Sequence, residues 1–90
     1  MKILVSGAAG FIGFHTATTL LQQGNIVIGV DNLNDYYDVT LKEDRLKELE
    51  LNTNFIFEKT DIVELTELRK VFIKHEPDIV IHLATQAGCR

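Results

Sequence analysis

Apolar runs and amphipathic stretches alternate along the entire chain. Short runs rich in Ile, Val, Leu and Phe predict four buried strands, at residues 2–6, 25–30, 55–57 and 78–83. Between them, apolar residues at helical spacing predict three helices, at residues 11–23, from residue 40 onward, and at 63–75. Strands that alternate with helices are typical of a parallel sheet covered by helices. The pattern therefore predicts one α/β unit over residues 1–90.

The predicted helices and the last strand carry specific expectations about burial. Thr40, with Glu43 three residues later, has the spacing of a capping box at the start of the second helix. Pro77 should prevent the third helix from continuing, and the strand at 78–83 is apolar enough to be buried on both faces. We expect Leu41, Leu46 and Leu49 to be buried in the second helix and Leu65, Leu68, Val71 and Phe72 in the third, with Lys42, Glu43, Lys47, Glu48 and Glu50 largely on the exposed side.

The first strand runs directly into three spaced glycines, Gly7, Gly10 and Gly13. Gly7 would allow a tight turn, Gly10 would let a phosphate approach the main chain, and Gly13 would let the helix pack against the sheet. Backbone N–H groups and the positive end of the helix dipole would then converge on one spot, as they do in pyrophosphate sites. The alternative is a strand–helix–strand unit whose glycines serve packing alone.

Asp31 follows the second strand, eighteen residues after Gly13, and Gly24 is placed to stop the helix between them. A carboxylate at this point would accept hydrogen bonds from both ribose hydroxyls of an adenosine. Its charge would repel a 2′-phosphate, and no Lys or Arg occurs within the next ten residues. The pattern therefore predicts a dinucleotide site that prefers NAD to NADP. In the alternative reading, Asp31 only begins a turn.

Right-handed crossovers restrict how the strands are ordered. We expect a partial Rossmann fold, with a parallel sheet in the order 3-2-1-4 and three helices. The first two helices would cover one face of the sheet and the third helix the other. The cofactor would bind at the switch point between the first and fourth strands, near the glycine loop, Asp31 and residues 84–90. The open edge and the thinly covered face favour a larger protein or a homo-oligomer.

Composition and charge exclude several classes of function. With 46% hydrophobic and 24% charged residues, the chain has a soluble, globular composition. A net charge of −4 gives no basic footprint for nucleic acid or an anionic membrane. No apolar run approaches the roughly 20 residues that span a bilayer. A cytoplasmic location is expected, because Cys89 is the only cysteine and no internal disulfide can form.

The histidines and the cysteine do not form a metal motif. His15 is expected on a helix surface or in packing, and His75 near the negative end of a helix dipole. His82 is expected to be hydrogen-bonded within a buried strand. Cys89 has no Cys–His arrangement around it that would make a reactive thiol.

The glycine loop, followed by Phe11 and Ile12, resembles the cofactor motif of the extended short-chain dehydrogenase/reductase superfamily, which includes nucleotide-sugar epimerases and dehydratases. The runs at 31–38 and 82–90, together with Leu41 and Lys42, resemble the UDP-glucuronate 4-epimerase branch. That branch includes bacterial enzymes that make galacturonate for capsules and cell-surface polysaccharides. The resemblance covers all 90 residues but only about the first quarter to third of such an enzyme.

The resemblance implies contacts with NAD and with a sugar nucleotide. Arg90 matches an arginine near the bound sugar nucleotide, whose phosphate or carboxylate suits a guanidinium. Thr85 and Cys89 depart from the usual alanine and valine, and neither change threatens cofactor binding. The implied NAD contacts are Gly7, Gly10, Phe11, Ile12 and Gly13 at the pyrophosphate, Asp31, Asn32, Asn34 and Asp35 at the ribose, Asp61 and Ile62 at the adenine, and Leu83, Ala84, Thr85 and Gln86 at the nicotinamide.

The reaction of such epimerases needs residues that this chain lacks. In the family mechanism, a tyrosine takes a proton from the sugar 4-hydroxyl while NAD accepts hydride from C4, and hydride returns after the 4-keto sugar rotates. That tyrosine has a lysine four residues later, but the residues four after Tyr36 and Tyr37 are Thr40 and Leu41. We identify no catalytic residue here, and we expect the isolated chain to be inactive.

Two further functions stay open at this point. The first is another epimerase or dehydratase of the same superfamily that acts on a different nucleotide sugar. The second is a non-catalytic module, a truncated gene product that binds NAD or only assembles. A downstream in-frame Tyr-x-x-x-Lys segment would favour an enzyme, whereas a natural stop codon after Arg90 would favour the module.

Overall fold

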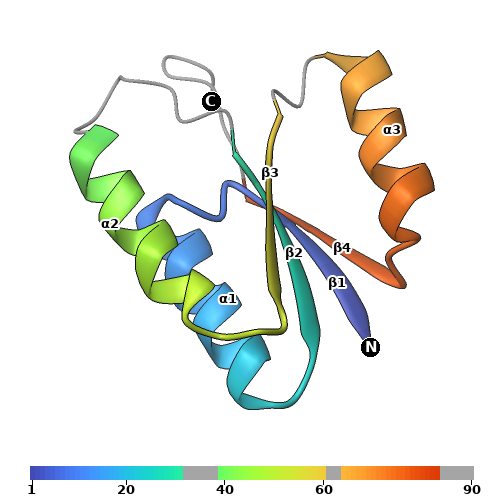
Figure 1. The fold of residues 1–90 in the computed structure, drawn as a ribbon. Coiled ribbons are helices and arrows are strands. Elements are labelled where there is room, and N and C mark those ends of the chain that lie inside the picture. Colours follow the sequence, from blue (N-terminus) through green and yellow to red (C-terminus); the bar gives the residue numbers. More distant parts are fainter. Residues whose placement is uncertain (32–38, 61–63, 84–90) are drawn as a thin grey trace.

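The computed structural model describes residues 1–31, 39–60 and 64–83 (Figure 1). Its four strands are all parallel and lie in the order β3-β2-β1-β4. The elements in chain order are β1 (Lys2–Ser6), α1 (Phe11–Gln22), β2 (Ile26–Asp31), α2 (Val39–Glu50), β3 (Phe55–Lys59), α3 (Leu65–His75) and β4 (Ile79–His82). This is the α/β fold and the strand order that the sequence predicts.

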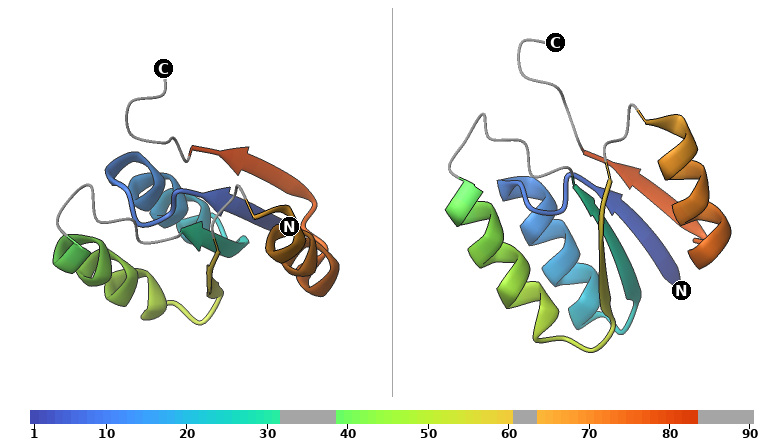
Figure 2. Two further views of the ribbon diagram at one scale, coloured as in Figure 1. Left: turned by 90° about the horizontal axis from the view of Figure 1, so that it is seen from above. Right: turned by 45° about the horizontal axis from the view of Figure 1, so that its top comes forward.

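Helices cover the two faces of the sheet unequally. Figure 2 shows α1 and α2 side by side against one face, while α3 lies alone against the other. The first face buries Ile3, Val5, Ala8, Ala9, Ala17, Leu21, Val27, Leu46, Leu49 and Phe55. The second buries Leu4, Ile28, Val30 and Val71, with Phe72 packed against them. The predicted distribution of the helices between the faces is therefore confirmed.

Glycine and proline end two of the helices as expected. Gly24 follows the end of α1 with a φ of 88°, a left-handed conformation that glycine adopts without steric cost. At the end of α3, Glu76 takes a φ of 49° directly before Pro77. Its N–H donates to the carbonyl of Phe72 at 2.8 Å, so the helix closes before the proline.

The predicted start and buried face of α2 are partly wrong. The helix begins at Val39, one residue before the predicted start, so Thr40 lies inside its first turn. Leu46 and Leu49 are buried as expected, but Leu41 is 47% exposed. Lys42, expected on the exposed side, is buried instead. The face that packs inward is set by residues 42, 46 and 49, which are spaced by four and three positions.

The α3 face also differs from the expectation. Leu65 begins α3 but is 74% exposed, and Leu68 and Phe72 are only half-buried. Strand β4 is not buried on both faces, because Ile79 and Val80 are 43% and 47% exposed. The reason is that Val71 packs on Leu4, Ile28 and Val30 of the central strands, and that among the described residues β4 pairs on one side only, with β1. Within the described ranges, no helix has the length and apolar character to cross a bilayer.

Candidate functional site

The loop between β1 and α1 is tied to the end of β2. Gly7 has a φ of 74°, which confirms the predicted tight turn after the strand. The N–H groups of Gly7 and Ala8 both donate to the carbonyl of Val30, at 2.7 and 3.3 Å. The N–H of Gly10 donates to the carbonyl of Gly7 at 3.0 Å. The loop is therefore fixed at the carboxyl ends of two neighbouring parallel strands, where α/β proteins place their ligands.

Gly13 brings the first turn of α1 directly onto this loop. A Cβ atom at Gly13 would lie 1.9 Å from the carbonyl oxygen of Gly7 and 3.0 Å from the Cα of Ala8. A Cβ at Gly10 would lie 3.3 Å from the same oxygen, which is tight but not impossible. The close packing predicted for Gly13 is confirmed, and its contact is the backbone of the loop itself.

The amino end of α1 has features that suit an anion. Gly10 is the residue before the helix, and no side chain caps it. The first bond of the helix runs from Phe14 N–H to the Gly10 carbonyl at 2.8 Å, so the amides of residues 11–13 precede it. The first turn contains no acidic residue, and Phe11 and Ile12 are 64% and 65% exposed. A helix end of this kind attracts phosphate through its N–H groups and its dipole.

Asp31, the last residue of β2, points its carboxylate at the glycine loop. The side chain is buried, and its Oδ2 accepts a hydrogen bond from Ala9 N–H at 3.0 Å. Its Oδ1 lies 3.4 Å from the ammonium nitrogen of Lys42. The predicted acid and the predicted loop therefore form one site, joined by a direct hydrogen bond.

Two cations from α2 reach the same site, and sequence reasoning missed both. Lys42 pairs with Asp31, and Arg45 donates to the carbonyl of Ala9 at 3.0 Å while its guanidinium carbon lies 5.9 Å from the centre of the Phe11 ring. Lys42 is the eleventh residue after Asp31, just beyond the ten in which no cation occurs. The signal that could have found them is their helical spacing from apolar residues. Residues 42 and 45 share a helix face with the buried Leu46 and Leu49.

The switch point between β1 and β4 is held by Ser6 and His82. The Ser6 hydroxyl oxygen accepts from Leu83 N–H at 2.9 Å and lies 2.9 Å from His82 Nδ1. The expected hydrogen bond of His82 is confirmed. His82 itself is exposed, because β4 is an edge strand of the described sheet. Leu83 is thereby fixed at the carboxyl end of β1, beside Ser6, the residue that precedes Gly7.

Several predicted site residues lie outside the described part of the chain. They are Asn32, Asn34, Asp35, Asp61, Ile62, Ala84, Thr85, Gln86 and Arg90, and Tyr36, Tyr37 and Cys89 lie outside it as well. Those that the structure does bring together are Gly7, Gly10, Phe11, Ile12, Gly13 and Asp31, with Leu83 at the end of β4. Among residues 1–31, 39–60 and 64–83, no three His, Cys, Asp or Glu side chains gather into a metal site.

The other two histidines lie in local contacts. His15 is exposed and packs edge-on against Phe11 and Phe14, as expected for a helix-surface residue. His75 Nε2 makes a hydrogen bond with the Glu58 carboxylate of β3. That hydrogen bond, helped by the nearby ammonium of Lys74, lowers the pKa of Glu58 below its usual range against an opposing effect of burial.

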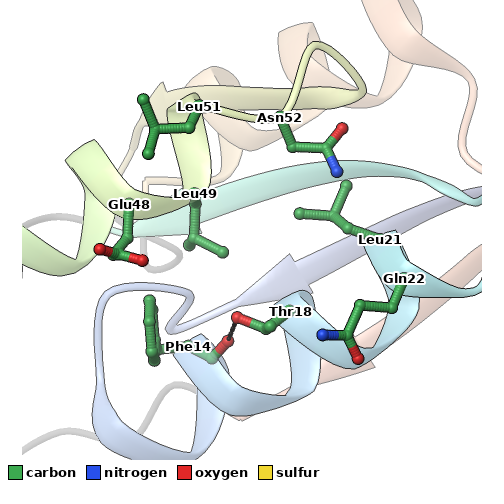
Figure 3. Close-up of a pocket in the computed structure, with 8 residues that line it drawn as sticks. All are labelled: Phe14, Thr18, Leu21, Gln22, Glu48, Leu49, Leu51 and Asn52. Atoms are coloured by element: carbon green, nitrogen blue, oxygen red, sulfur yellow. Dashed lines mark hydrogen bonds between the residues drawn. The ribbon is translucent and has the colours of Figure 1, made fainter.

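A hollow of about 360 Å³ lies between α1 and α2 (Figure 3). It is lined by Phe14, Thr18, Leu21, Gln22, Glu48, Leu49, Leu51 and Asn52. The Thr18 hydroxyl in its wall is satisfied by the carbonyl of Phe14 at 2.8 Å (Figure 3). Its one ionisable side chain is an acid, Glu48, which does not suit a phosphate. We therefore assign the hollow to helix packing and place the functional site at the glycine loop.

Comparisons with known proteins show which family the chain is similar to. A family model described as GDP-mannose 4,6 dehydratase matches residues 4–90. Protein CapI of Staphylococcus aureus is 53% identical over 90 residues, which are 100% of this chain and 27% of that protein. A UDP-glucuronate 4-epimerase of Thermodesulfobacterium geofontis is 51% identical over 87 residues, 97% of this chain and 27% of that enzyme. The chain thus spans about a quarter of the length of the curated relatives it matches.

Solved structures show the same likeness in three dimensions. The crystal structure of UDP-glucuronic acid 4-epimerase from Bacillus cereus in complex with UDP-glucuronic acid and NAD superposes with a TM-score of 0.85 at 43% sequence identity. The match covers 100% of this chain and 28% of that one. A dTDP-glucose 4,6-dehydratase from Bacillus anthracis in complex with NAD superposes with a TM-score of 0.83 at 26% identity.

Proposed function

The chain belongs to the GDP-mannose 4,6-dehydratase family, and from this membership we propose that residues 1–90 are the N-terminal, NAD-binding part of a nucleotide-sugar 4-epimerase. The observation that carries the proposal is the hydrogen bond between Asp31 and the N–H of Ala9. It places the acid against the same loop that presents the open end of α1. The proposed ribose acceptor and the proposed phosphate donors therefore lie side by side.

The described residues fit a dinucleotide in several ways. The amides of residues 11–13 would hold the pyrophosphate, and Gly13 keeps the helix close enough to the loop for them to reach it. Asp31 would accept the ribose hydroxyls. Leu83, fixed by Ser6 at the switch point, would contact the nicotinamide side. Bound NAD would supply the hydride acceptor for the sugar C4.

The remaining NAD contacts are proposed on the resemblance alone. Asn32, Asn34 and Asp35 would complete the ribose side, and Asp61 and Ile62 would meet the adenine. Ala84, Thr85 and Gln86 would continue the nicotinamide side from Leu83. Arg90 would approach the phosphate or carboxylate of the sugar nucleotide.

The proposed substrate of the full enzyme is UDP-glucuronate. Support comes from two relatives whose names specify that activity or that ligand, the enzymes of T. geofontis and B. cereus. The chain contains no Tyr-x-x-x-Lys segment, so we expect the 90-residue chain to leave UDP-glucuronate unchanged when NAD is present. Chromatographic detection of UDP-galacturonate above a no-protein blank would contradict that expectation.

We propose a cytoplasmic location, which the single cysteine favours, and a role in making precursors of cell-surface polysaccharides, which the resemblance implies. We also propose self-association through the open sheet edge or face, since Ile79 and Val80 of β4 are exposed and β4 pairs only with β1 among the described residues. Light scattering across a range of protein concentrations tests the self-association, and a monomer at all of them would contradict it.

Calorimetric titration of the chain with NAD tests the central proposal. Combining Asp31→Ala with Gly10→Val removes the ribose acceptor and crowds the loop, so we expect NAD affinity to fall by about 100-fold or more. Asp44→Ala removes an exposed acid from α2 and should leave NAD affinity unchanged. Equal NAD affinity in the double variant and the parent chain would contradict the assignment of this loop.

A further inference from the structure

Lys42 is a buried lysine beside the proposed ribose site. Its side chain is 11% exposed, and the side chain of its partner Asp31 is 5% exposed. Lysine and aspartate are seldom buried this deeply, because removing both charges from water costs more than an ordinary pairing returns. A buried pair at the edge of a ligand site therefore invites a functional explanation.

The pair leaves bonding capacity on the lysine. An ammonium carries three N–H donors. Within the described residues, Lys42 Nζ has one hydrogen-bond partner, Asp31 Oδ1, at the long distance of 3.4 Å. The other carboxylate oxygen is fixed by Ala9 N–H at 3.0 Å, so Asp31 is held between the glycine loop and α2. The Lys42 side chain is thus about nine-tenths buried at the site, and two of its three donors have no partner among the described residues.

We propose that Lys42 is a specificity-determining residue for the adenosine ribose, and this proposal rests on the proposed NAD site. A hydroxyl group donates one hydrogen bond and accepts others. Asp31 would accept from a ribose O–H, while Lys42 would donate to a ribose oxygen. The two residues together therefore match a diol better than either one does alone.

In the same geometry, Asp31 is the only side chain we identify among the described residues whose charge would repel a 2′-phosphate. Its negative charge is compensated by Lys42, and Arg45 brings a second cation to the loop at Ala9. Neutralising Asp31 would leave an ammonium positioned for phosphate oxygens. The site is thus an NAD site in which a phosphate-binding cation is already present but is paired with an acid.

Titration of four chains with both NAD and NADP tests this inference. The chains are the parent, Asp31→Ser, Lys42→Met and the Asp31→Ser/Lys42→Met double variant. We expect the parent to prefer NAD, and Lys42→Met to weaken NAD binding about tenfold. Asp31→Ser should weaken NAD binding and strengthen NADP binding by about tenfold each, and the gain for NADP should disappear in the double variant.

Two matched variants separate specificity from folding. Lys42→Arg keeps the charge and should bind NAD within about threefold of the parent, whereas Lys47→Met removes an exposed cation from the same helix and should change neither affinity. Circular dichroism of each variant checks that the fold is retained. If Lys42→Met does not fold, two variants that retain the cation still test the role of Lys42. They are Lys42→Arg, through its NAD affinity, and Asp31→Ser, through its NADP affinity.

Specific outcomes overturn the inference. If Asp31→Ser does not gain NADP affinity, or if its gain survives Lys42→Met, Lys42 is only a structural partner that docks α2 onto β2. Those results would leave the proposed function intact, because the parent chain would still bind NAD. A parent chain that binds neither nucleotide would instead contradict the proposed function, and the inference with it.

Discussion

Among the described residues, the sheet face covered by α1 and α2 buries ten apolar side chains in one cluster, whereas the face covered by α3 buries four. The glycine loop, Asp31 and Lys42 all lie at the edge of the larger cluster, which includes Ala8 and Ala9 of the loop itself. Packing that is this dense leaves little freedom to the backbone. The proposed ligand geometry is therefore built on the more densely packed side of the sheet.

The α3 face depends more on polar contacts at its rim. Lys2 N–H donates to Asp78 at 2.9 Å, and the Lys2 ammonium donates to the His75 carbonyl at 3.1 Å. Glu58 binds His75 and lies 3.3 Å from the ammonium of Lys74. Such exposed or half-exposed contacts contribute less stability than apolar burial does, and they respond to pH and salt. The two faces should therefore respond differently to mutation and to solution conditions.

The largest expected effect is on the packed side, at Gly13. Gly13→Ala places a Cβ about 2 Å from the Gly7 oxygen, so the helix must move away from the loop, and we expect a loss of about 3 kcal/mol or more in the free energy of unfolding. Urea denaturation measures it. Gly10→Ala is the control, because its contact of 3.3 Å to the same oxygen should cost only about 1 kcal/mol. Equal losses would show that the loop is not rigid.

A matched pair on one strand compares the two faces directly. Val27 and Val30 are both fully buried in β2, but Val27 belongs to the α1/α2 cluster and Val30 to the α3 cluster. We expect Val27→Ala to cost about 2.5 kcal/mol and Val30→Ala about 1.5 kcal/mol, because the thinner layer can relax around a cavity. Urea denaturation of both variants gives the difference, and a larger loss at Val30 would reverse the comparison.

The two faces of the sheet also differ in how much of their structure the sequence could predict. β1, the strand order and the stops at Gly24 and Pro77 follow from local signals and from the handedness of crossovers, and the structure agrees with them. Burial on the α3 face does not follow from such signals. Leu65 has the right helical spacing, but spacing does not specify which strands a helix will cover, and α3 covers the centre of the sheet rather than β4.

The candidate site divides in a similar way. Gly7 and Gly13 are identifiable because a tight turn and a close backbone contact require glycine, and Asp31 because a ribose site needs an acid at the end of this strand. Lys42 could not be identified from charge patterning, since a lysine on an amphipathic helix is normally exposed. Its long aliphatic stem can be buried while its ammonium reaches a partner eleven residues earlier, and only the tertiary fold sets that distance.

A smaller effect on stability is expected when the pH is lowered, at Glu58 on the rim of the α3 face. Because the pKa of Glu58 is lowered in the folded state, its stabilising contribution is present above the ordinary pKa of glutamate and is lost as pH falls through the folded value. Glu58→Gln should remove that part of the pH dependence and cost up to about 1 kcal/mol at neutral pH. Thermal unfolding between pH 7 and about pH 3 measures both. Glu67→Gln, in the exposed pair that Glu67 forms with Lys70 on α3, should cost less than Glu58→Gln at neutral pH.

The smallest effect should come from Leu65, an apolar residue whose predicted burial is wrong. At 74% exposure it has little buried area to lose, so Leu65→Ala should change the free energy of unfolding by no more than about 0.5 kcal/mol. Val71→Ala on the same helix, at a buried position, should cost clearly more. Urea denaturation of the two variants separates them. A large loss at Leu65 would mean that the start of α3 is covered by other parts of the protein in solution, and the weaker packing inferred for this face would then be wrong.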